Sequence, residues 1–175
     1  MKEISFIFGG CRSGKSSYAL KTAEQISGNK KVFIATCVPL DDEMKNRVFM
    51  HQKQRGANWI TIDAPLLLAE TVADVCLSAD VILIDCIGLW ITNLLLSNEF
   101  EGNIFNKVEN FIEVLKKINI PILIVSNEVG CGIVPENKLA REFRDILGFA
   151  NQKIAECSDK VVLMAAGIPM VIKSQ

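Results

Sequence analysis

Short apolar runs rich in β-branched residues alternate along this chain with longer segments in which apolar residues recur at helical spacing. That alternation is typical of βαβ units and predicts a mainly parallel β-sheet with helices packed on it. The expected strands are residues 4–8, 32–36, 59–62, 81–85, 122–126, 161–164 and 170–173. The expected helices are residues 15–26, 41–54, 65–77, 89–96, 103–118 and 137–155.

The last two expected strands are joined by a short link, residues 165–169, which contains Gly167. A link of this length favours a hairpin, so the last strand is predicted to be an antiparallel edge strand. No repeat, low-complexity tract or linker interrupts the 175 residues. We therefore expect a single domain over residues 1–175.

Charge and hydropathy exclude several classes of protein. The 19 basic and 20 acidic residues leave a net charge of −1, which argues against a nucleic-acid-binding protein. The most apolar stretch, residues 82–96, carries Asp85, Thr92 and Asn93, so we expect no membrane insertion. The apolar run before Gly9 is too short for a signal peptide, and we expect a cytoplasmic protein.

The six cysteines do not form a metal-binding pattern. They contain no C-x-x-C pair, and the chain has one histidine to join them. We expect them to be reduced thiols, mostly in the core.

One glycine-rich segment lies between the first expected strand and the first expected helix. It reads Gly9-Gly10-Cys11-Arg12-Ser13-Gly14-Lys15-Ser16 and fits the phosphate-binding pattern G-x-x-x-x-G-K-[ST]. In such a loop, backbone N–H groups surround phosphate oxygens, Lys15 reaches the terminal phosphates and Ser16 offers a hydroxyl to Mg²⁺. The alternative is an ordinary glycine-rich turn between a strand and a helix.

A carboxylate at the end of a neighbouring strand would complete a magnesium site with Ser16. Asp85 ends the expected strand 81–85, and Glu128 follows the strand 122–126. Either side chain could instead have an ordinary role, Asp85 as a strand-ending acid and Glu128 as a cap of the turn before Gly130. The pattern predicts an α/β, three-layer P-loop NTPase (RecA-like) fold, with a mostly parallel seven-stranded sheet and one antiparallel edge strand.

The only histidine, His51, lies in the expected helix 41–54. On that helix Met44, Val48, His51 and Arg55 share one stripe, which is apolar at one end and polar at the other. Such a histidine can be a nucleophile, but a surface or packing role is the more common one.

Several segments resemble one family, the bifunctional adenosylcobinamide kinase/adenosylcobinamide-phosphate guanylyltransferases of cobalamin biosynthesis. In the first half they are FGGCRSGKS at 8–16, IAT at 34–36, LDDEM at 40–44, His51 with Arg55 and Trp59, IDCI at 84–87 and TNLL at 92–95. In the second half they are SNEVGCGIVP at 126–135, REFRD at 141–145, NQ at 151–152 and GIP at 167–169. The likeness runs in order from residue 4 to residue 173.

The resemblance implies two reactions. The hydroxyl of the aminopropanol arm of adenosylcobinamide is first phosphorylated by ATP or GTP. GMP is then transferred from GTP to that phosphate through a GMP-histidine intermediate, giving adenosyl-GDP-cobinamide. The family histidine falls on His51, and Met50 stands where members often carry a second histidine. Neutral imidazole is a suitable nucleophile for such a transfer near pH 7.

The resemblance also implies site residues and partners. Lys15 and His51 are the expected catalytic residues, and Ser16 and Asp85 the expected magnesium ligands. The expected nucleotide contacts are Gly9, Gly10, Cys11, Arg12, Ser13, Gly14, Lys15, Ser16, Ala35, Thr36, Cys37, Gln52, Lys53, Gln54, Arg55, Asp63 and Asp85. The substrates are the corrinoid and the nucleoside triphosphates, and the protein is expected to be a homo-oligomer, a trimer by the resemblance.

Some alternatives stay open at this point. Asp63 could be an ordinary loop acid. Four arginines could either bind phosphate groups or be solvated side chains, namely Arg12, Arg55, Arg141 and Arg144. A P-loop small-molecule kinase would not need His51. A GTPase-like switch is disfavoured because no Asn-Lys pair continues into N-K-x-D.

Overall fold

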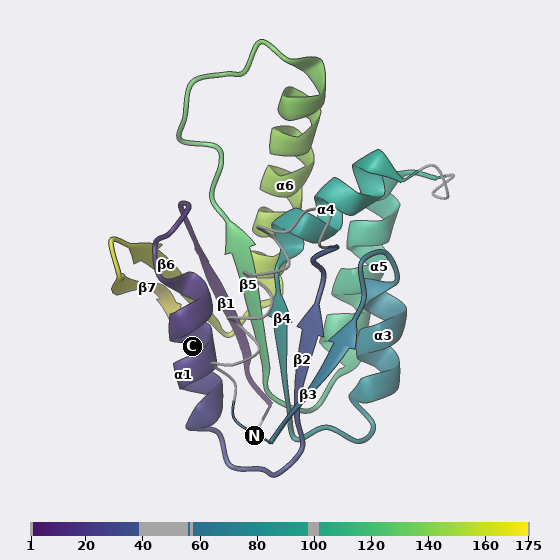
Figure 1. Ribbon diagram of the computed structural model, residues 1–175, viewed down its shortest axis with the longest axis vertical. Helices are drawn as coiled ribbons and strands as arrows, with labels where there is room; N and C mark the ends of the chain where they lie inside the picture. Colours follow the sequence, from purple (N-terminus) through teal and green to yellow (C-terminus); the bar gives the residue numbers. More distant parts are fainter. Residues whose placement is uncertain (1, 39–55, 57, 98–101, 175) are drawn as a thin grey trace.

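The computed structural model describes residues 2–38, 56, 58–97 and 102–174 (Figure 1). Within these ranges seven strands form one sheet in the order β3-β2-β4-β5-β1-β6-β7. The strands are β1 (Ile4–Gly9), β2 (Lys31–Ala35), β3 (Trp59–Asp63), β4 (Val81–Asp85), β5 (Ile122–Asn127), β6 (Lys160–Ala165) and β7 (Ile168–Ser174). Every neighbouring pair is parallel except β6 and β7. The predicted sheet, with its antiparallel edge strand, is confirmed.

Helices cover both faces of this sheet, which makes three layers. They are α1 (Lys15–Glu24), α3 (Leu68–Val75), α4 (Ile87–Leu96), α5 (Ile104–Lys117) and α6 (Lys138–Cys157). On one face, residues such as Phe6 and Ile84 pack against α3, α4, α5 and α6. On the other, Ile7 and Leu83 pack against Ala19 of α1. Successive side chains of a strand point to opposite faces, so the uninterrupted apolar runs suit a sheet that is buried on both sides.

The expected helix 41–54 lies outside the described residues. Elsewhere the helix and strand boundaries differ by a few residues from those expected. The helix expected from residue 65 begins at Leu68, and the helix expected from residue 89 begins at Ile87. In the described ranges, no helix combines the length and the apolar character needed to cross a membrane.

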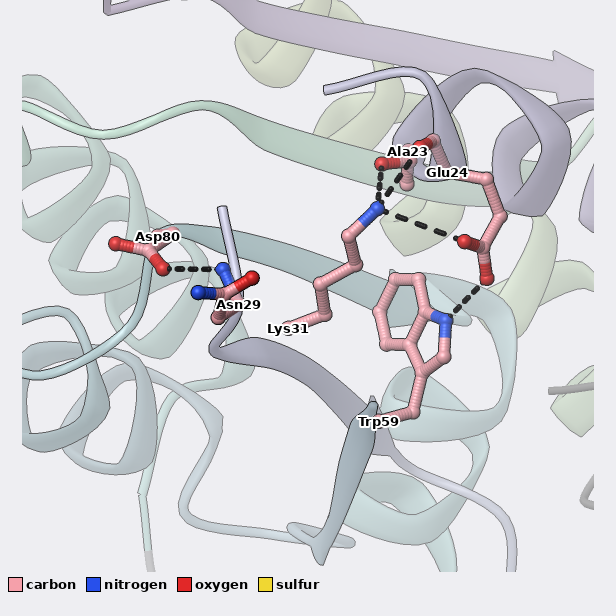
Figure 2. A network of polar contacts seen from close by, with 6 residues as sticks. All are labelled: Ala23, Glu24, Asn29, Lys31, Trp59 and Asp80. Atoms are coloured by element: carbon pink, nitrogen blue, oxygen red, sulfur yellow. Dashed lines mark hydrogen bonds and ion pairs between the residues drawn. The ribbon is translucent and has the colours of Figure 1, made fainter. Parts of the chain in front are cut away.

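A buried lysine joins three elements at the amino edge of the sheet (Figure 2). The Nζ of Lys31, at the start of β2, donates to Ala23 O at 3.0 Å and to Glu24 O at 2.9 Å. These carbonyls end α1, where a cation is favoured and backbone acceptors lack helical partners. The carboxylate of Glu24 also lies 3.5 Å from Lys31 Nζ and accepts from Trp59 Nε1 at 2.5 Å. The end of α1 is therefore bound to both β2 and β3.

A second contact at this edge fixes the chain just before β2. Asp80 Oδ2 accepts from the backbone N–H groups of Asn29 and Lys30, each at 2.9 Å, and Figure 2 shows the bond to Asn29. These bonds stabilise the charged carboxylate and lower the pKa of Asp80 below its usual 3.8. The contacts of Lys31 and Asp80 hold the amino edge together, at the opposite edge from the glycine-rich loop.

Candidate active site

The glycine-rich loop joins the carboxyl end of β1 to the first turn of α1, as the sequence predicts. Gly9 is required there because a Cβ at this position would collide with Met164 O of β6. Lys15 is only 9% exposed, and its ammonium group donates to Gly10 O at 2.9 Å. Ser16 follows in the first turn of α1, where backbone N–H groups and the helix dipole favour an anion. The loop thus places a lysine, a hydroxyl and a helix N-terminus at one point.

Three predicted site residues lie side by side on neighbouring strands. Ala35 at the end of β2 is paired in register with Asp63 of β3 and with Asp85 of β4. On the far side of β4, Asp85 pairs with Val125 of β5. The two carboxylates therefore stand at the same edge as the glycine-rich loop, where open α/β sheets bind ligands.

Thr36 lies at this edge, but its side chain is fully buried. Its Oγ1 donates to Cys86 O at 2.7 Å and accepts from Cys86 N at 2.8 Å, joining the ends of β2 and β4. The hydroxyl therefore both donates and accepts a hydrogen bond within the protein. Burial and the charge of Asp85 raise the pKa of Cys86 to about 12, so this thiol stays protonated. Cys37, the next residue after Thr36, is half-buried.

Two asparagines that the sequence analysis did not assign hold the edge in place. Asn93 of α4 donates to Thr36 O at 2.7 Å and to Pro65 O at 3.1 Å. Asn151 of α6 accepts from Ser126 Oγ at 2.6 Å and donates to Asn127 O at 2.9 Å. The sequence feature that could have identified them is an amide side chain on an otherwise apolar face of a helix, because a buried amide usually finds a backbone partner.

A cavity of about 670 Å³ adjoins the glycine-rich loop. Its walls come from that loop, from the β6–β7 turn and from the β5–α6 loop, which we define as residues 128–137. Glu128 N donates to Gly9 O at 2.9 Å, which joins the β5–α6 loop to the end of β1. Cys11, Glu128 and Cys131 all line the cavity.

The carboxylate of Glu128 accepts from Gly130 N at 2.6 Å and from Cys131 N at 3.2 Å. It therefore does cap the turn before Gly130. A hydrogen bond to the Glu128 carboxylate and its negative charge raise the pKa of the Cys131 thiol.

Two arginines of α6 hold the β5–α6 loop. Arg144 donates to Gly130 O at 2.6 Å, and Arg141 donates to Pro135 O at 2.9 Å and to Glu136 O at 2.5 Å. In this arrangement their guanidinium groups bind carbonyls of the chain. Arg12, in the glycine-rich loop, is exposed.

The remaining predicted residues, His51, Gln52, Lys53, Gln54 and Arg55, lie outside the described residues. In the described ranges no three His, Cys, Asp or Glu side chains gather as metal ligands. Ser16 and Asp85 offer the oxygen atoms that Mg²⁺ prefers, and this ion commonly takes its other ligands from water and phosphate.

The strand order and the loop between β1 and α1 are those of a P-loop nucleotide-binding protein. Among solved structures, the chain resembles flagellar accessory protein FlaH from Methanocaldococcus jannaschii, with a TM-score of 0.51, 15% identity and coverage of 99% of this chain and 79% of that one. It also resembles an ATPase of a bacterial type III secretion system, with a TM-score of 0.58, 10% identity and coverage of 92% and 50%. These likenesses confirm the predicted fold.

The chain belongs to the family described as cobinamide kinase / cobinamide phosphate guanyltransferase, whose model matches residues 5–172. It is 38% identical to the bifunctional adenosylcobalamin biosynthesis protein CobP of Pseudomonas aeruginosa, over 97% of this chain and 96% of the relative. It is 37% identical to the bifunctional adenosylcobalamin biosynthesis protein CobU of Salmonella typhimurium, over 95% of this chain and 98% of the relative. The family expected from the sequence is confirmed.

Proposed function

We propose that this protein phosphorylates adenosylcobinamide with ATP or GTP and then transfers GMP from GTP to the product, giving adenosyl-GDP-cobinamide and pyrophosphate. The observation that carries this proposal is the glycine-rich loop with Lys15 at its base, in a chain that matches bifunctional relatives over almost its whole length. One domain, residues 1–175, carries both reactions.

In the kinase step the loop binds the triphosphate. Backbone N–H groups of residues 10–14 and the N-terminus of α1 bind phosphate oxygens, and Lys15 exchanges its bond to Gly10 O for the terminal phosphates. The substrate hydroxyl attacks the γ-phosphorus and gives its proton to water, the bond from the γ-phosphorus to the bridging oxygen breaks, and the nucleoside diphosphate leaves. Ser16 and Asp85 would hold Mg²⁺, which neutralises charge that develops on the phosphates. Ala35, Cys37 and Asp63 lie along the same edge and contact the rest of the nucleotide, whereas the fully buried Thr36 holds this edge in place.

In the transfer step His51 is the nucleophile, with Gln52, Lys53, Gln54 and Arg55 as nucleotide contacts. An imidazole nitrogen attacks the α-phosphorus of GTP, a P–N bond forms and pyrophosphate leaves. A phosphate oxygen of adenosylcobinamide phosphate then attacks the same phosphorus, and the P–N bond breaks. His51 is the only histidine in the chain, so no other imidazole can carry GMP.

We also infer a cytoplasmic homo-oligomer, a trimer by resemblance to the family. Strand β7 supports an interface between copies because several of its apolar side chains are exposed. They are Ile168, Met170, Val171 and Ile172, with exposed fractions of 65%, 51%, 54% and 57%. Sedimentation analysis of the purified chain measures the number of subunits, and a monomer at micromolar concentration would contradict this inference.

The test of the two-step reaction uses GTP labelled at the α-phosphate. The wild-type protein should acquire a label that survives base and is released by acid, as expected of a P–N bond. His51→Ala should lose this label and GMP transfer while it still phosphorylates adenosylcobinamide. A histidine variant that transfers GMP normally would indicate direct transfer, and a wild-type protein with kinase activity alone would indicate a small-molecule kinase.

A further inference from the structure

Two apolar side chains project from the tip of the β5–α6 loop. Ile133 is 97% exposed and Val134 is 63% exposed, whereas Val129 at the base of the same loop packs against the core. A single exposed apolar side chain is common on protein surfaces. An adjacent pair of exposed apolar side chains, on a loop that starts in the candidate active site, is a more specific indication of a binding surface. We call Ile133 and Val134 the apolar tip.

The loop is fixed on both sides of the apolar tip. Before it, Glu128 binds the N–H groups of Gly130 and Cys131, and Arg144 binds Gly130 O. After it, Arg141 binds Pro135 O and Glu136 O. Charged groups that bond to a loop's own backbone reduce the conformational freedom that a ligand would otherwise have to remove. The apolar tip is therefore presented in a preformed position.

The apolar tip follows the wall of the cavity closely in sequence. Glu128 and Cys131 line the cavity together with the glycine-rich loop, and Ile133 follows Cys131 by two residues. In Figure 1 the β5–α6 loop is the light green segment that rises from the end of β5 and turns into α6. A ligand that enters the cavity with one end would meet the apolar tip with the part that stays outside.

We propose that the apolar tip binds the corrin macrocycle of the substrate, which rests on the function proposed above. The reacting hydroxyl stands at the end of a short arm, and it must reach the terminal phosphate held near Lys15. The cavity of about 670 Å³ borders that phosphate site and has the volume of a pocket for a drug-sized ligand, and a corrin macrocycle with its side chains is larger than such a ligand. The macrocycle therefore stays outside the cavity, where its methyl groups cover Ile133 and Val134 and remove apolar surface from water.

The test compares Ile133→Asp and Val134→Asp with wild type in the kinase reaction. We expect the KM for adenosylcobinamide to rise about tenfold, equivalent to about 1.4 kcal/mol. The KM for the nucleotide and the labelling of the protein by GTP should not change. Ile133→Leu, which keeps the apolar surface, should retain the wild-type KM. Leu77→Asp is the matched control, because Leu77 is 88% exposed and follows α3 near the opposite edge of the sheet.

Equilibrium dialysis against adenosylcobinamide, read by its visible absorption, measures the same affinity without catalysis. Unchanged corrinoid affinity in both aspartate variants of an active protein would overturn the inference and leave the proposed function intact. A change in sedimentation in these variants would mean that the apolar tip contacts a second copy, which would also overturn it. A wild-type protein that neither binds nor phosphorylates adenosylcobinamide would remove both proposals.

Discussion

The backbone N–H of Gly167 donates to Ser13 O at 3.0 Å, which bonds the β6–β7 turn to the glycine-rich loop. Gly167 has a φ of +84°, and the preceding Ala166 a φ of +51°, as a tight hairpin turn requires. We expect Gly167→Ala to weaken nucleotide binding several-fold, because an alanine strains this turn by about 1 kcal/mol and shifts its contact with Ser13. Calorimetric titration with GTP measures the change.

The control for that variant is Gly148→Ala. Gly148 lies within α6, and a Cβ there would meet no atom within 4 Å. Alanine is favoured over glycine in a helix by about 1 kcal/mol, so this variant should be more stable and bind GTP normally. Equal losses of GTP affinity in both variants would contradict a specific role for the turn.

Lys15→Ala should lose both activities, because in the proposed mechanism both reactions place a triphosphate on the glycine-rich loop. Removing one charge from a desolvated phosphate site lowers the rate by on the order of 10³ or more. Lys21→Ala, an exposed position on the same helix, should be nearly normal. Steady-state assays of each half-reaction decide this, and normal kinase turnover by Lys15→Ala would refute the assignment of the loop.

Thr36→Val should destabilise the protein by about 2 kcal/mol, because it leaves the buried N–H of Cys86 without its Thr36 acceptor. Cys86 O loses one donor but still accepts from Trp90 N. Thr36→Ser keeps the hydroxyl and should cost only about 1 kcal/mol. Urea denaturation of the two variants measures the difference. If both lose the same stability, the hydroxyl does not stabilise the junction between β2 and β4.

Asp80 should contribute to stability in a pH-dependent way. Its pKa is lowered in the folded protein, so its stabilising effect is present above its unfolded value and is lost as the pH falls through the lower, folded value. We expect Asp80→Asn to be less stable than wild type at pH 6, with the difference shrinking below about pH 4. Urea midpoints measured from pH 3 to pH 7 test this, and a difference that grows toward low pH would contradict it.

Glu128→Gln should make Cys131 more reactive. Glu128 raises the pKa of Cys131 through a hydrogen bond and its negative charge, so removing the charge should lower that pKa and increase the thiolate fraction at pH 8. Alkylation by iodoacetamide, followed for the Cys131 peptide by mass spectrometry, should be several-fold faster. Cys157, which is distant in sequence, serves as the internal reference, and an unchanged ratio of the two rates would argue against the contact.

Local sequence patterns predicted much of this fold for physical reasons. Strands 81–85 and 122–126 are continuous apolar runs, and the sheet that contains them is buried on both faces. The hairpin was predictable because Gly167 sits in a link too short for a crossover. The order of the strands was not, since pairs such as Ile4 with Ile122 join residues far apart in the chain.

The candidate site, too, was predictable only in part. The phosphate-binding motif predicted the glycine-rich loop, and the position of Asp85 at the end of an expected strand predicted its place in the site. The structure puts both at the same edge of the sheet. The two bonds of the Thr36 hydroxyl and the carbonyl partners of Arg141 and Arg144 could not be predicted, because they depend on which backbone atoms the fold brings near each side chain. The residues next to Asn93 and Asn151 in the sequence do not indicate which carbonyls these two side chains bind.

The position of β1 inside the sheet, between β5 and β6, has a consequence for synthesis on the ribosome. This strand carries the glycine-rich loop near the start of the chain, yet its partners in the sheet are β5 and β6, at residues 122–127 and 160–165. The loop therefore leaves the ribosome well before both of its flanking strands. Such long-range pairing slows folding and leaves an apolar strand unpaired during translation. The nucleotide site should accordingly be among the last parts of the nascent chain to become competent for binding.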